Sequence, residues 1–310
     1  MTLQQLQYVV ALDDHRHFVR AAAACFVTQP TLTMQVRKLE EELRVSLFDR
    51  RVQPVRPTAI GAHLIAQSRV VLREAAQLNA LIGELHSGIG GLYRVGVIPT
   101  LAPYLVPLFL PGFAKAHPDV KLVIDERKTS RIIKGLRRGE IDLGILVTPV
   151  DLPDIEEVAL FREPFLAYLP EGHPLRKRRR VQRSDLREQA LWVLSEGHCF
   201  REQTLSLCDR PSAGGHDNVL YESGSIETLK QLVRSGSGMT LVPELSVTPD
   251  DPHVRRFNTP EPVREVSLVM RRPFVRRKLI GAFAAAIHAS LPEHLCGGSL
   301  RAGRALPIAR

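Results

Sequence analysis

Residues 28–43 read TQPTLTMQVRKLEEEL, and this stretch decides the fold of the first part of the 310-residue chain. Its apolar residues recur three and four positions apart, which is typical of a helix with one buried face. Thr28 or Gln29 is able to cap such a helix, and Pro30 suits its first turn. The stretch therefore predicts a helix whose buried face carries Leu32, Val36, Leu39 and Leu43.

The opposite face of this helix is polar. It carries Thr31, Met34, Gln35 and Lys38, with Arg37 beside them. Small polar donors near the start of a helix, followed by cations, are what a helix needs to read base edges in the major groove and to hold phosphates. A solvated amphipathic helix is the alternative that these residues leave open.

Helical patterns also flank this stretch. Before it, apolar residues recur at helical spacing in residues 3–10 and 18–25, which predicts two further helices and places Cys25 on an apolar face. After it, apolar residues recur about every 3.5 positions in residues 58–87, with Thr58 as a candidate cap. One helix of this length extends ~45 Å and cannot cover its own apolar stripe. We expect it to pack on a second copy, with packing on its own chain as the alternative.

Beyond a glycine-rich break at residues 88–91, apolar runs alternate with helical patterns. This alternation indicates α/β layers with mostly parallel sheets, and two such series predict two lobes. Thr100 and Thr129 follow the first two strands, where ligands of such sheets bind, and each is either a helix cap or a ligand. The strands are expected at 92–98, 120–124, 141–147, 165–169, 191–194, 239–242 and 266–270, and the helices at 105–116, 130–138, 225–235 and 275–289.

Residues 198–208 read HCFREQTLSLC and contain two of the four cysteines. In a helix this spacing puts the thiols on opposite faces, with their Cα atoms ~13 Å apart. A disulfide needs ~7 Å or less, so a bond between Cys199 and Cys208 implies that the helix unwinds. His198, Arg201 and the helix N-terminus would each favour the Cys199 thiolate, which peroxide oxidises to a sulfenic acid. Two buried structural thiols, or a zinc site that includes His198, are the alternatives.

The composition is that of an ordinary soluble protein, with 44% hydrophobic and 24% charged residues. No apolar run approaches the ~18 residues of a membrane span and the first residues lack a signal-peptide pattern, so we expect a cytoplasmic protein without membrane contact. A net charge of +9 permits a polyanionic partner without locating it. The run Arg176–Arg180 is expected to be a solvated loop, and residues 296–310, with Cys296, a disordered tail.

Residues 1–61 resemble the winged helix-turn-helix of LysR-type transcriptional regulators. The match is carried by FVRAA at 18–22, QPTLT at 29–33, VRKLE at 36–40 and LFDR at 47–50. The resemblance implies that residues 1–57 bind double-stranded DNA and that residues 58–87 form a dimerisation helix. The DNA-facing residues that it implies are Thr28, Gln29, Pro30, Thr31, Thr33, Met34, Gln35, Arg37 and Lys38, with Arg50, Arg51 and Arg56 on the wing.

Residues 92–295 resemble the effector domain of the same regulators. The fold class that follows is a winged helix-turn-helix plus a long linker helix, followed by an α/β two-lobed effector domain similar to periplasmic binding proteins. The resemblance implies that this domain spans residues 88–295. Its lobes would comprise about 92–161 with 266–295, and about 162–265.

Within that family, the chain resembles the hydrogen-peroxide-sensing OxyR branch through GVIPT at 96–100, SEGHC at 195–199, SIETL at 225–229 and the cysteine spacing. The resemblance implies a peroxidatic Cys199 and a resolving Cys208 that form a disulfide and alter DNA binding at oxidative-stress promoters. It implies that Thr100, Thr129 and His198 position peroxide, with Arg201 and Glu202 as further members of the network.

The resemblance implies no metal and no cofactor. It implies homodimers that pair into a homotetramer, RNA polymerase as a further partner, and glutaredoxin or thioredoxin as the reductant. The thiol would be oxidised once per signal rather than turning over as an enzyme. The alternatives are a LysR-type regulator with a non-redox small molecule between its lobes, and a thiol peroxidase.

Overall fold

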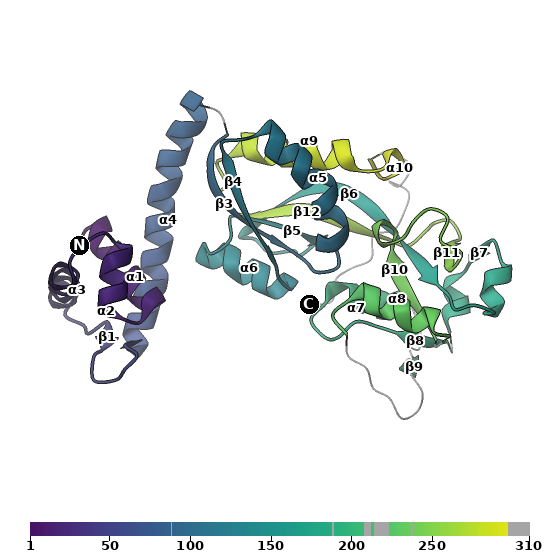
Figure 1. The fold of residues 1–310 in the computed structure, drawn as a ribbon, viewed down its shortest axis with the longest axis horizontal. Helices are drawn as coiled ribbons and strands as arrows, with labels where there is room; N and C mark the ends of the chain where they lie inside the picture. Colours follow the sequence, from purple (N-terminus) through teal and green to yellow (C-terminus); the bar gives the residue numbers. More distant parts are fainter. Residues whose placement is uncertain (88, 188, 208–211, 214–222, 237, 297–310) are drawn as a thin grey trace. The chain divides into compact units, whose positions relative to one another are not determined.

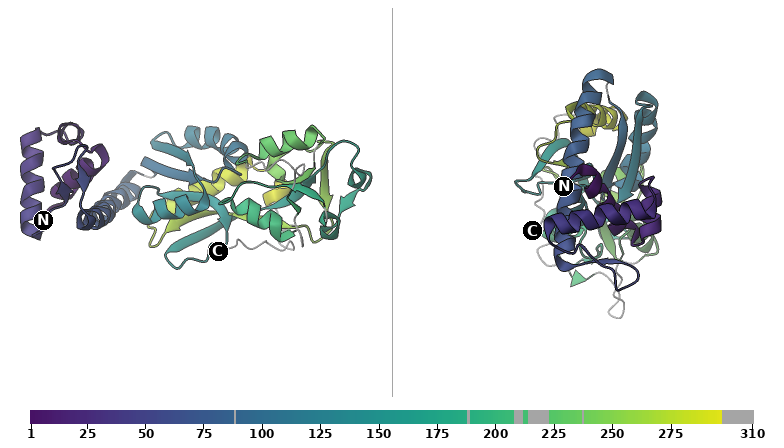
Figure 2. Two further views of the ribbon diagram at one scale, coloured as in Figure 1. Left: turned by 90° about the horizontal axis from the view of Figure 1, so that it is seen from below. Right: turned by 90° about the vertical axis from the view of Figure 1, so that its left-hand side faces the viewer.

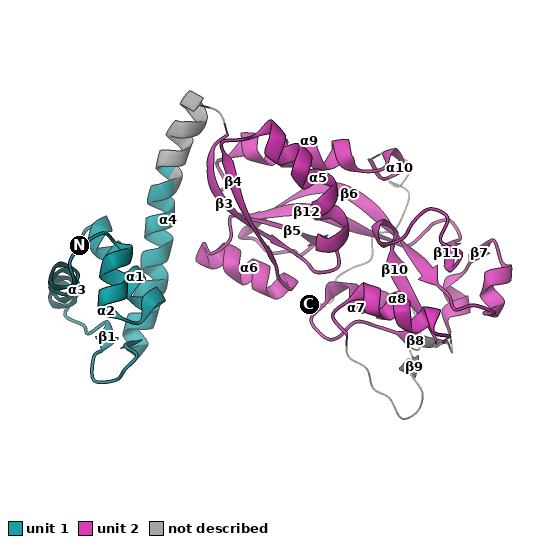
Figure 3. Cartoon of the chain, in the orientation of Figure 1, with its two compact units in different colours: residues 1–86 teal, residues 87–310 magenta. Residues whose placement is uncertain are grey.

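The computed structural model divides into two compact units, Met1–His86 and Ser87–Arg310 (Figure 3). The residues that it describes are 1–87, 89–187, 189–207, 212–213, 223–236 and 238–296. None of the helices in these ranges has an apolar stretch long enough to cross a membrane. Within the same ranges, no three His, Cys, Asp or Glu side chains cluster closely enough to hold a metal ion.

The first unit consists of packed helices and a short antiparallel wing (Figure 1). Helix α3 (Gln29–Leu43) begins as the sequence predicts: the Thr28 hydroxyl accepts a hydrogen bond from the Thr31 amide at 3.4 Å, and Pro30 lies in the first turn. Its apolar face is buried in a core shared with α1 and α2. The other elements are α1 (Leu3–His15), α2 (Phe18–Ala24), and strands β1 (Phe48–Asp49) and β2 (Arg56–Pro57), which pair with each other.

Helix α4 (Ala59–Ser87) starts directly after the wing. Thr58 caps it, because its hydroxyl accepts a hydrogen bond from the Gly61 amide at 2.9 Å. Glycine is required at position 61, since a Cβ there would lie 1.9 Å from the carbonyl oxygen of Leu47. The first turn of α4 is therefore pressed against the segment that leads into the wing.

Helix α4 carries exposed apolar side chains beyond its first turns. Val71 is 36% exposed and Leu78 is 64% exposed. The side chains of residues 79–87, which include the end of the predicted stripe, lie outside the described residues. The predicted packing of this helix on a second copy therefore remains a prediction.

The second unit is built on one mixed sheet of ten strands (Figures 1 and 2). Strand β3 (Gly91–Val97) pairs in parallel with β4 (Val120–Glu126) and β5 (Leu143–Thr148), and β12 (Val263–Arg271) continues the sheet. Helices α5 and α9 cover one face of this part and α6 the other. Their bounds are α5 (Ala102–Ala116), α6 (Thr129–Arg138) and α9 (Arg277–Ser290), followed by α10 (Glu293–Cys296).

The sheet continues through the long strand β6 (Ile155–Tyr168), which joins its two parts. Beyond β6 lie the strands β7 (Arg180–Val181), β8 (Ala190–Trp192), β9 (Ser212–Ala213), β10 (Met239–Pro243) and β11 (Val254–Phe257). The helices of this part are α7 (Cys199–Leu207) and α8 (Ile226–Arg234), with 3₁₀ turns η1 (Pro174–Lys177), η2 (Arg183–Leu186) and η3 (Glu244–Ser246).

Two details of the predicted sheet need correction. The sheet is mixed rather than mostly parallel, because β12 runs antiparallel to both β5 and β6. An apolar run marks a strand but does not give its direction. The first ten residues of β6 and the whole of β11 were also absent from the prediction, since charged residues such as Glu156 and Arg255 interrupt their apolar pattern.

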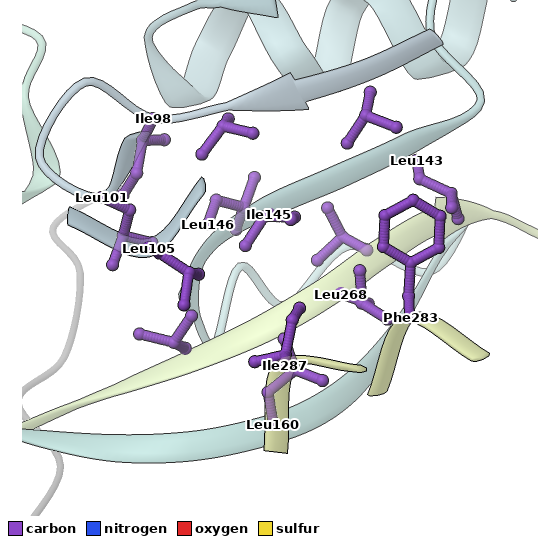
Figure 4. Packing of buried hydrophobic residues seen from close by; sticks show 14 of the residues in the cluster. Ile98, Leu101, Leu105, Leu143, Ile145, Leu146, Leu160, Leu268, Phe283 and Ile287 are labelled. Atoms are coloured by element: carbon purple, nitrogen blue, oxygen red, sulfur yellow. The ribbon is translucent and has the colours of Figure 1, made fainter. Parts of the chain in front are cut away.

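The second unit has two hydrophobic cores. One contains residues from Tyr93 to Phe161 and from Val266 to Leu295, with side chains of α5, β5, β12 and α9 facing one another (Figure 4). The other contains residues from Phe165 to Phe257. The start of α7 joins them, because Cys199 packs in the first core and Phe200 in the second.

Of the remaining sequence predictions, the run Arg176–Arg180 is exposed from Lys177 onward but is not only a loop, because it begins in η1 and ends in β7. Arg178 pairs with Asp185 at 2.8 Å and Arg180 with Glu261 at 2.7 Å. The described residues end at Cys296, which is exposed. The prediction that the disordered tail begins at Cys296 is wrong, because Cys296 is the last residue of α10, and the rest of the predicted tail, 297–310, lies outside the described residues.

Candidate functional site

Cys199 is the first residue of α7 and is only 6% exposed. The chain enters the helix through Gly197, whose φ of 82° lies in the left-handed region that favours glycine. The first helical turn begins with a hydrogen bond from the Arg201 amide to the His198 carbonyl at 2.9 Å. The sulfur therefore lies at the positive end of a helix while being shielded from water.

Burial dominates the electrostatics of this thiol and raises the pKa of Cys199 above its ordinary value. The positive charge of Arg264 opposes this rise most strongly, followed by a hydrogen bond with the Thr129 hydroxyl and by backbone amides. At rest Cys199 is therefore mainly a thiol, with a cation and donors in place to stabilise the thiolate once it forms.

The sequence prediction that His198 and Arg201 supply this positive charge is wrong. Burial, aided by the charge of Lys128, lowers the pKa of His198, so its imidazole is neutral. The Arg201 guanidinium donates a hydrogen bond to the Leu194 carbonyl at 2.8 Å. The cation that acts on Cys199 comes instead from β12, far away in the sequence.

Arg264 is held by a fully buried ion pair. Its guanidinium lies 2.6 Å from the carboxylate of Glu163, which also accepts the Leu245 amide at 2.7 Å. It donates to the hydroxyl and to the carbonyl of Thr100, both at 3.1 Å, and stacks over the Phe200 ring. Burial raises the pKa of Glu163, and the charge of Arg264 counteracts that rise.

Sequence reasoning missed Arg264 and Glu163. They lie opposite each other in the register of β12 and β6. The available signal was a charged residue two positions before each of two predicted apolar runs, 165–169 and 266–270, because a charge that is buried where a strand begins needs a partner. That signal indicates a partner for each residue but does not say which, since the two are 101 positions apart.

Of the predicted peroxide-positioning residues, the structure brings Thr129 and His198 to the cavity that Cys199 also lines. The Thr129 hydroxyl is buried and has no oxygen or nitrogen partner among the described residues, so it is available to the sulfur and to a small ligand. Thr100 is 2% exposed and does not line the cavity; its hydroxyl accepts a hydrogen bond from Arg264 instead. Glu202 lines the cavity, whereas Arg201 is turned to Leu194.

The cavity has a volume of about 680 Å³. Its walls come from α6, from the loop after β5 and from the start of α7. The residues that line it are Thr129, Ser130, Ile133, Lys134, Arg137, Pro149, Val150, Asp151, Leu152, Gly197, His198, Cys199 and Glu202.

Cys208, the predicted resolving thiol, lies outside the described residues. Helix α7 fills the segment from Cys199 to Leu207 and so separates its first and last Cα atoms by ~12 Å. A disulfide between Cys199 and Cys208 is therefore still predicted to require that this helix unwinds.

The predicted DNA-facing residues lie on α3 and the wing. Met34 is 58% exposed, and Arg37 and Lys38 are exposed as well. Some of the cations are paired within the unit: Arg37 with Glu41 at 3.0 Å, Arg50 with Glu40 at 2.7 Å and Arg51 with Asp49 at 3.2 Å. The remaining predicted residues are Thr28, Gln29, Pro30 and Arg56, which are exposed, and Thr31, Thr33 and Gln35, which are half-buried.

Comparison with known families matches both units. The model of the bacterial regulatory helix-turn-helix protein, lysR family, covers residues 3–62. The model of the LysR substrate binding domain covers residues 86–292. Together they span most of the chain.

Curated relatives are named for peroxide responses. A hydrogen peroxide-inducible genes activator of Dickeya chrysanthemi is 38% identical over 275 residues, which is 87% of this chain and 90% of that protein. The DNA-binding transcriptional dual regulator OxyR of Escherichia coli K12 is 36% identical over 302 residues, covering 95% of this chain and 97% of its own.

Solved structures of OxyR proteins are also similar to this chain. Full-length OxyR from Pseudomonas aeruginosa, with a cysteine-to-aspartate substitution, superposes with a TM-score of 0.77 and 34% identity, covering 94% of this chain and 99% of that one. A cysteine mutant of OxyR from Corynebacterium glutamicum, with hydrogen peroxide bound, has a TM-score of 0.63 and 28% identity, covering 100% of this chain and 98% of that one.

Proposed function

We propose, because this chain belongs to the LysR family of bacterial regulators and to its OxyR branch, that it is a transcriptional regulator whose Cys199 senses hydrogen peroxide. The observation that carries the proposal is the environment of that thiol. It lines a cavity together with Thr129 and His198, and Arg264 favours its thiolate from the buried side. A small peroxide that enters the cavity thus meets a nucleophile and donors at one point.

The sensing step is an oxygen transfer. The Cys199 thiolate attacks one oxygen of hydrogen peroxide, the S–O bond forms as the O–O bond breaks, and the leaving hydroxide takes up a proton to become water. The Thr129 hydroxyl and His198 position the peroxide, while Thr100 holds Arg264 in place. The Cys208 thiol then displaces water from the sulfenic acid to form a disulfide, which glutaredoxin or thioredoxin reduces.

The disulfide acts on the fold through α7. Cys199 leaves the first core when the helix unwinds, and Phe200 loses its stacking on Phe165, whose ring lies 5.0 Å away in the second core. Oxidation therefore shifts the domain between two packings rather than tightening one of them. Glu202 and Arg201, on the same helical turn, move with it.

The output is DNA binding by a dimer. The exposed faces of α3 and of the wing contact double-stranded DNA, and α4 pairs two copies through its exposed apolar side chains, including Val71 and Leu78. Two dimers form a tetramer that engages RNA polymerase. We place the regulator in the cytoplasm, where its DNA and its reductants are.

Mass spectrometry after low-excess peroxide treatment tests the proposal. The full-length protein is expected to gain a bond between Cys199 and Cys208 and a shifted footprint on its own upstream DNA. A Cys199→Ser variant keeps DNA binding and loses the shift. Cys296→Ser, which removes an exposed thiol far along the chain, is the matched control and leaves the shift intact.

Two rivals are tested in the same preparation. A footprint shift in the Cys199→Ser variant on addition of a non-redox small molecule would favour a ligand sensor, which the size of the cavity permits. Continuous peroxide consumption with thioredoxin would favour a thiol peroxidase. A sensor instead consumes one peroxide per reduced Cys199 and then stops.

A further inference from the structure

The cavity beside Cys199 is far larger than hydrogen peroxide needs. Its volume is about 680 Å³, whereas a water molecule takes up ~30 Å³ in the liquid and hydrogen peroxide is about the size of two. A volume in the range of ~300–1,000 Å³ is typical of sites for small organic ligands. The cavity therefore has space for a substituent on the peroxide.

The wall of the cavity is suited to an apolar substituent. Ile133 of α6 and Val150 and Leu152 of the loop after β5 line it, together with Pro149. Cys199 and the otherwise unpartnered hydroxyl of Thr129 line the same cavity and supply the groups that react with a peroxide. An apolar wall that leads to a nucleophile and a buried donor fits a ligand with an apolar body and a reactive polar end.

We infer that Cys199 also takes organic hydroperoxides, with the alkyl or aryl group in this cavity. The inference rests on the proposed function, because it uses the same thiol. The thiolate attacks the terminal oxygen of the hydroperoxide, the S–O bond forms as the O–O bond breaks, and the leaving alkoxide takes up a proton to become an alcohol. Cys199 ends as the same sulfenic acid, so the signal that follows is unchanged.

The test compares rate constants for Cys199 oxidation in the reduced full-length protein, with hydrogen peroxide and with cumene hydroperoxide. We expect cumene hydroperoxide to react within about tenfold of hydrogen peroxide. Val150→Trp fills the cavity and slows cumene hydroperoxide by about tenfold or more, while hydrogen peroxide changes by less than about twofold. Val106→Trp is the matched control, since it is a partly buried valine packed on the same core but lines a different pocket.

Ser130→Phe provides a second filling variant at an exposed position of the same cavity, in case Val150→Trp does not fold. Oxidation by hydrogen peroxide alone, with cumene hydroperoxide about a thousandfold slower, overturns the inference and leaves the proposed function intact. Equal slowing of both oxidants by the filling variants also overturns it. Failure of both oxidants to modify Cys199 overturns the proposed function itself.

Discussion

The exposed face of α3 and the surroundings of Cys199 are built in opposite ways. On α3 the functional side chains come from consecutive residues of one helix and point to solvent, with Met34 58% exposed. Around Cys199 they come from four distant segments, which contribute Thr100, Thr129, Cys199 and Arg264, and the polar atoms are buried. The first arrangement depends on a single helix, and the second on the whole second unit.

This difference between an exposed helix face and a buried polar cluster determines how large and how additive the effects of substitutions are. A side chain on an exposed helix face contributes its own contact, so its removal has a local and roughly additive effect. A buried polar group is hydrogen-bonded or ion-paired with other buried groups, so its removal leaves their charges and donors unsatisfied. We therefore expect large, coupled effects in the second unit and small, separable ones in the first.

The largest effect is expected for Arg264→Met. The substitution leaves Glu163 buried without its cation and is expected to lower the free energy of unfolding of the second unit by ~3–5 kcal/mol. Urea unfolding of the reduced protein measures it. The same substitution should slow peroxide oxidation of Cys199, because the thiolate loses the charge that most favours it.

Arg162→Met is the matched control, because Arg162 of β6 also pairs with a carboxylate on the adjacent strand, Glu265 of β12 at 2.9 Å, but is about one-third exposed. We expect it to cost ~1 kcal/mol or less. The double variant Arg264→Met with Glu163→Met should recover much of the loss. An Arg264→Met protein as stable as the Arg162→Met protein would contradict the view that the buried group behaves as one unit.

The next effect is a pH dependence. Because burial raises the pKa of Cys199, the thiolate is the minor form at neutral pH and its fraction grows as pH rises. We expect the rate of oxidation by hydrogen peroxide to increase by about tenfold per pH unit from about pH 6 to about pH 8. Burial and the charge of Lys128 lower the pKa of His198, so its imidazole loses its proton at lower pH than a free imidazole does. A rate that levels off below about pH 7 would show that the resting sulfur is a thiolate.

The same contrast explains what the sequence could predict. Thr28, Pro30 and the buried face of α3 were predictable because caps and helical periodicity are properties of neighbouring residues. Most strands of the second unit were predictable for the same reason, because an apolar run is also a property of neighbouring residues. The antiparallel direction of β12 was not predictable. It depends on pairing with β5 and β6, which lie about 100 residues earlier or more in the sequence.

Around Cys199, the sequence predicted the nearest neighbours and missed the distant ones. Proximity along the chain suggested that Arg201 acts on the thiol, but its guanidinium turns to the Leu194 carbonyl. Arg264 acts instead, because the register of β6 and β12 sets it opposite Glu163. The direction of a side chain and the register of two strands depend on tertiary packing, and the spacing of residues along one sequence does not determine them.

On the exposed side of the comparison, Lys38→Ala is expected to weaken DNA binding similarly for all sequences. One phosphate contact fewer should reduce the slope of log affinity against log salt by about 0.9. Fluorescence anisotropy on the upstream DNA at several salt concentrations measures both. Lys115→Ala, an exposed lysine of the second unit, is the control and should leave the slope unchanged. Unaltered salt dependence in the Lys38→Ala protein would remove Lys38 from the proposed interface.

The smallest effect is expected in the turn between α2 and α3. Phe26 is 96% exposed and has a φ of 56°, a left-handed conformation that is costly for an aromatic residue. The amides of Phe26 and Val27 close the end of α2 by bonding to the carbonyls of Ala23 and Ala22. This is the Schellman arrangement, in which glycine or asparagine usually occupies the left-handed position.

Phe26→Asn should therefore stabilise the first unit by about 1 kcal/mol, measured by thermal unfolding. Phe26→Ala separates the two causes, because it removes the exposed ring but keeps a residue that disfavours the left-handed conformation, and it should give no gain. If both variants stabilise the unit equally, the ring rather than the backbone is the cause. A Phe26→Asn protein that is more stable but binds DNA more weakly would show that the exposed ring contacts DNA. The left-handed conformation at Phe26 would then be kept for DNA binding, and the turn would belong to the same binding face as α3.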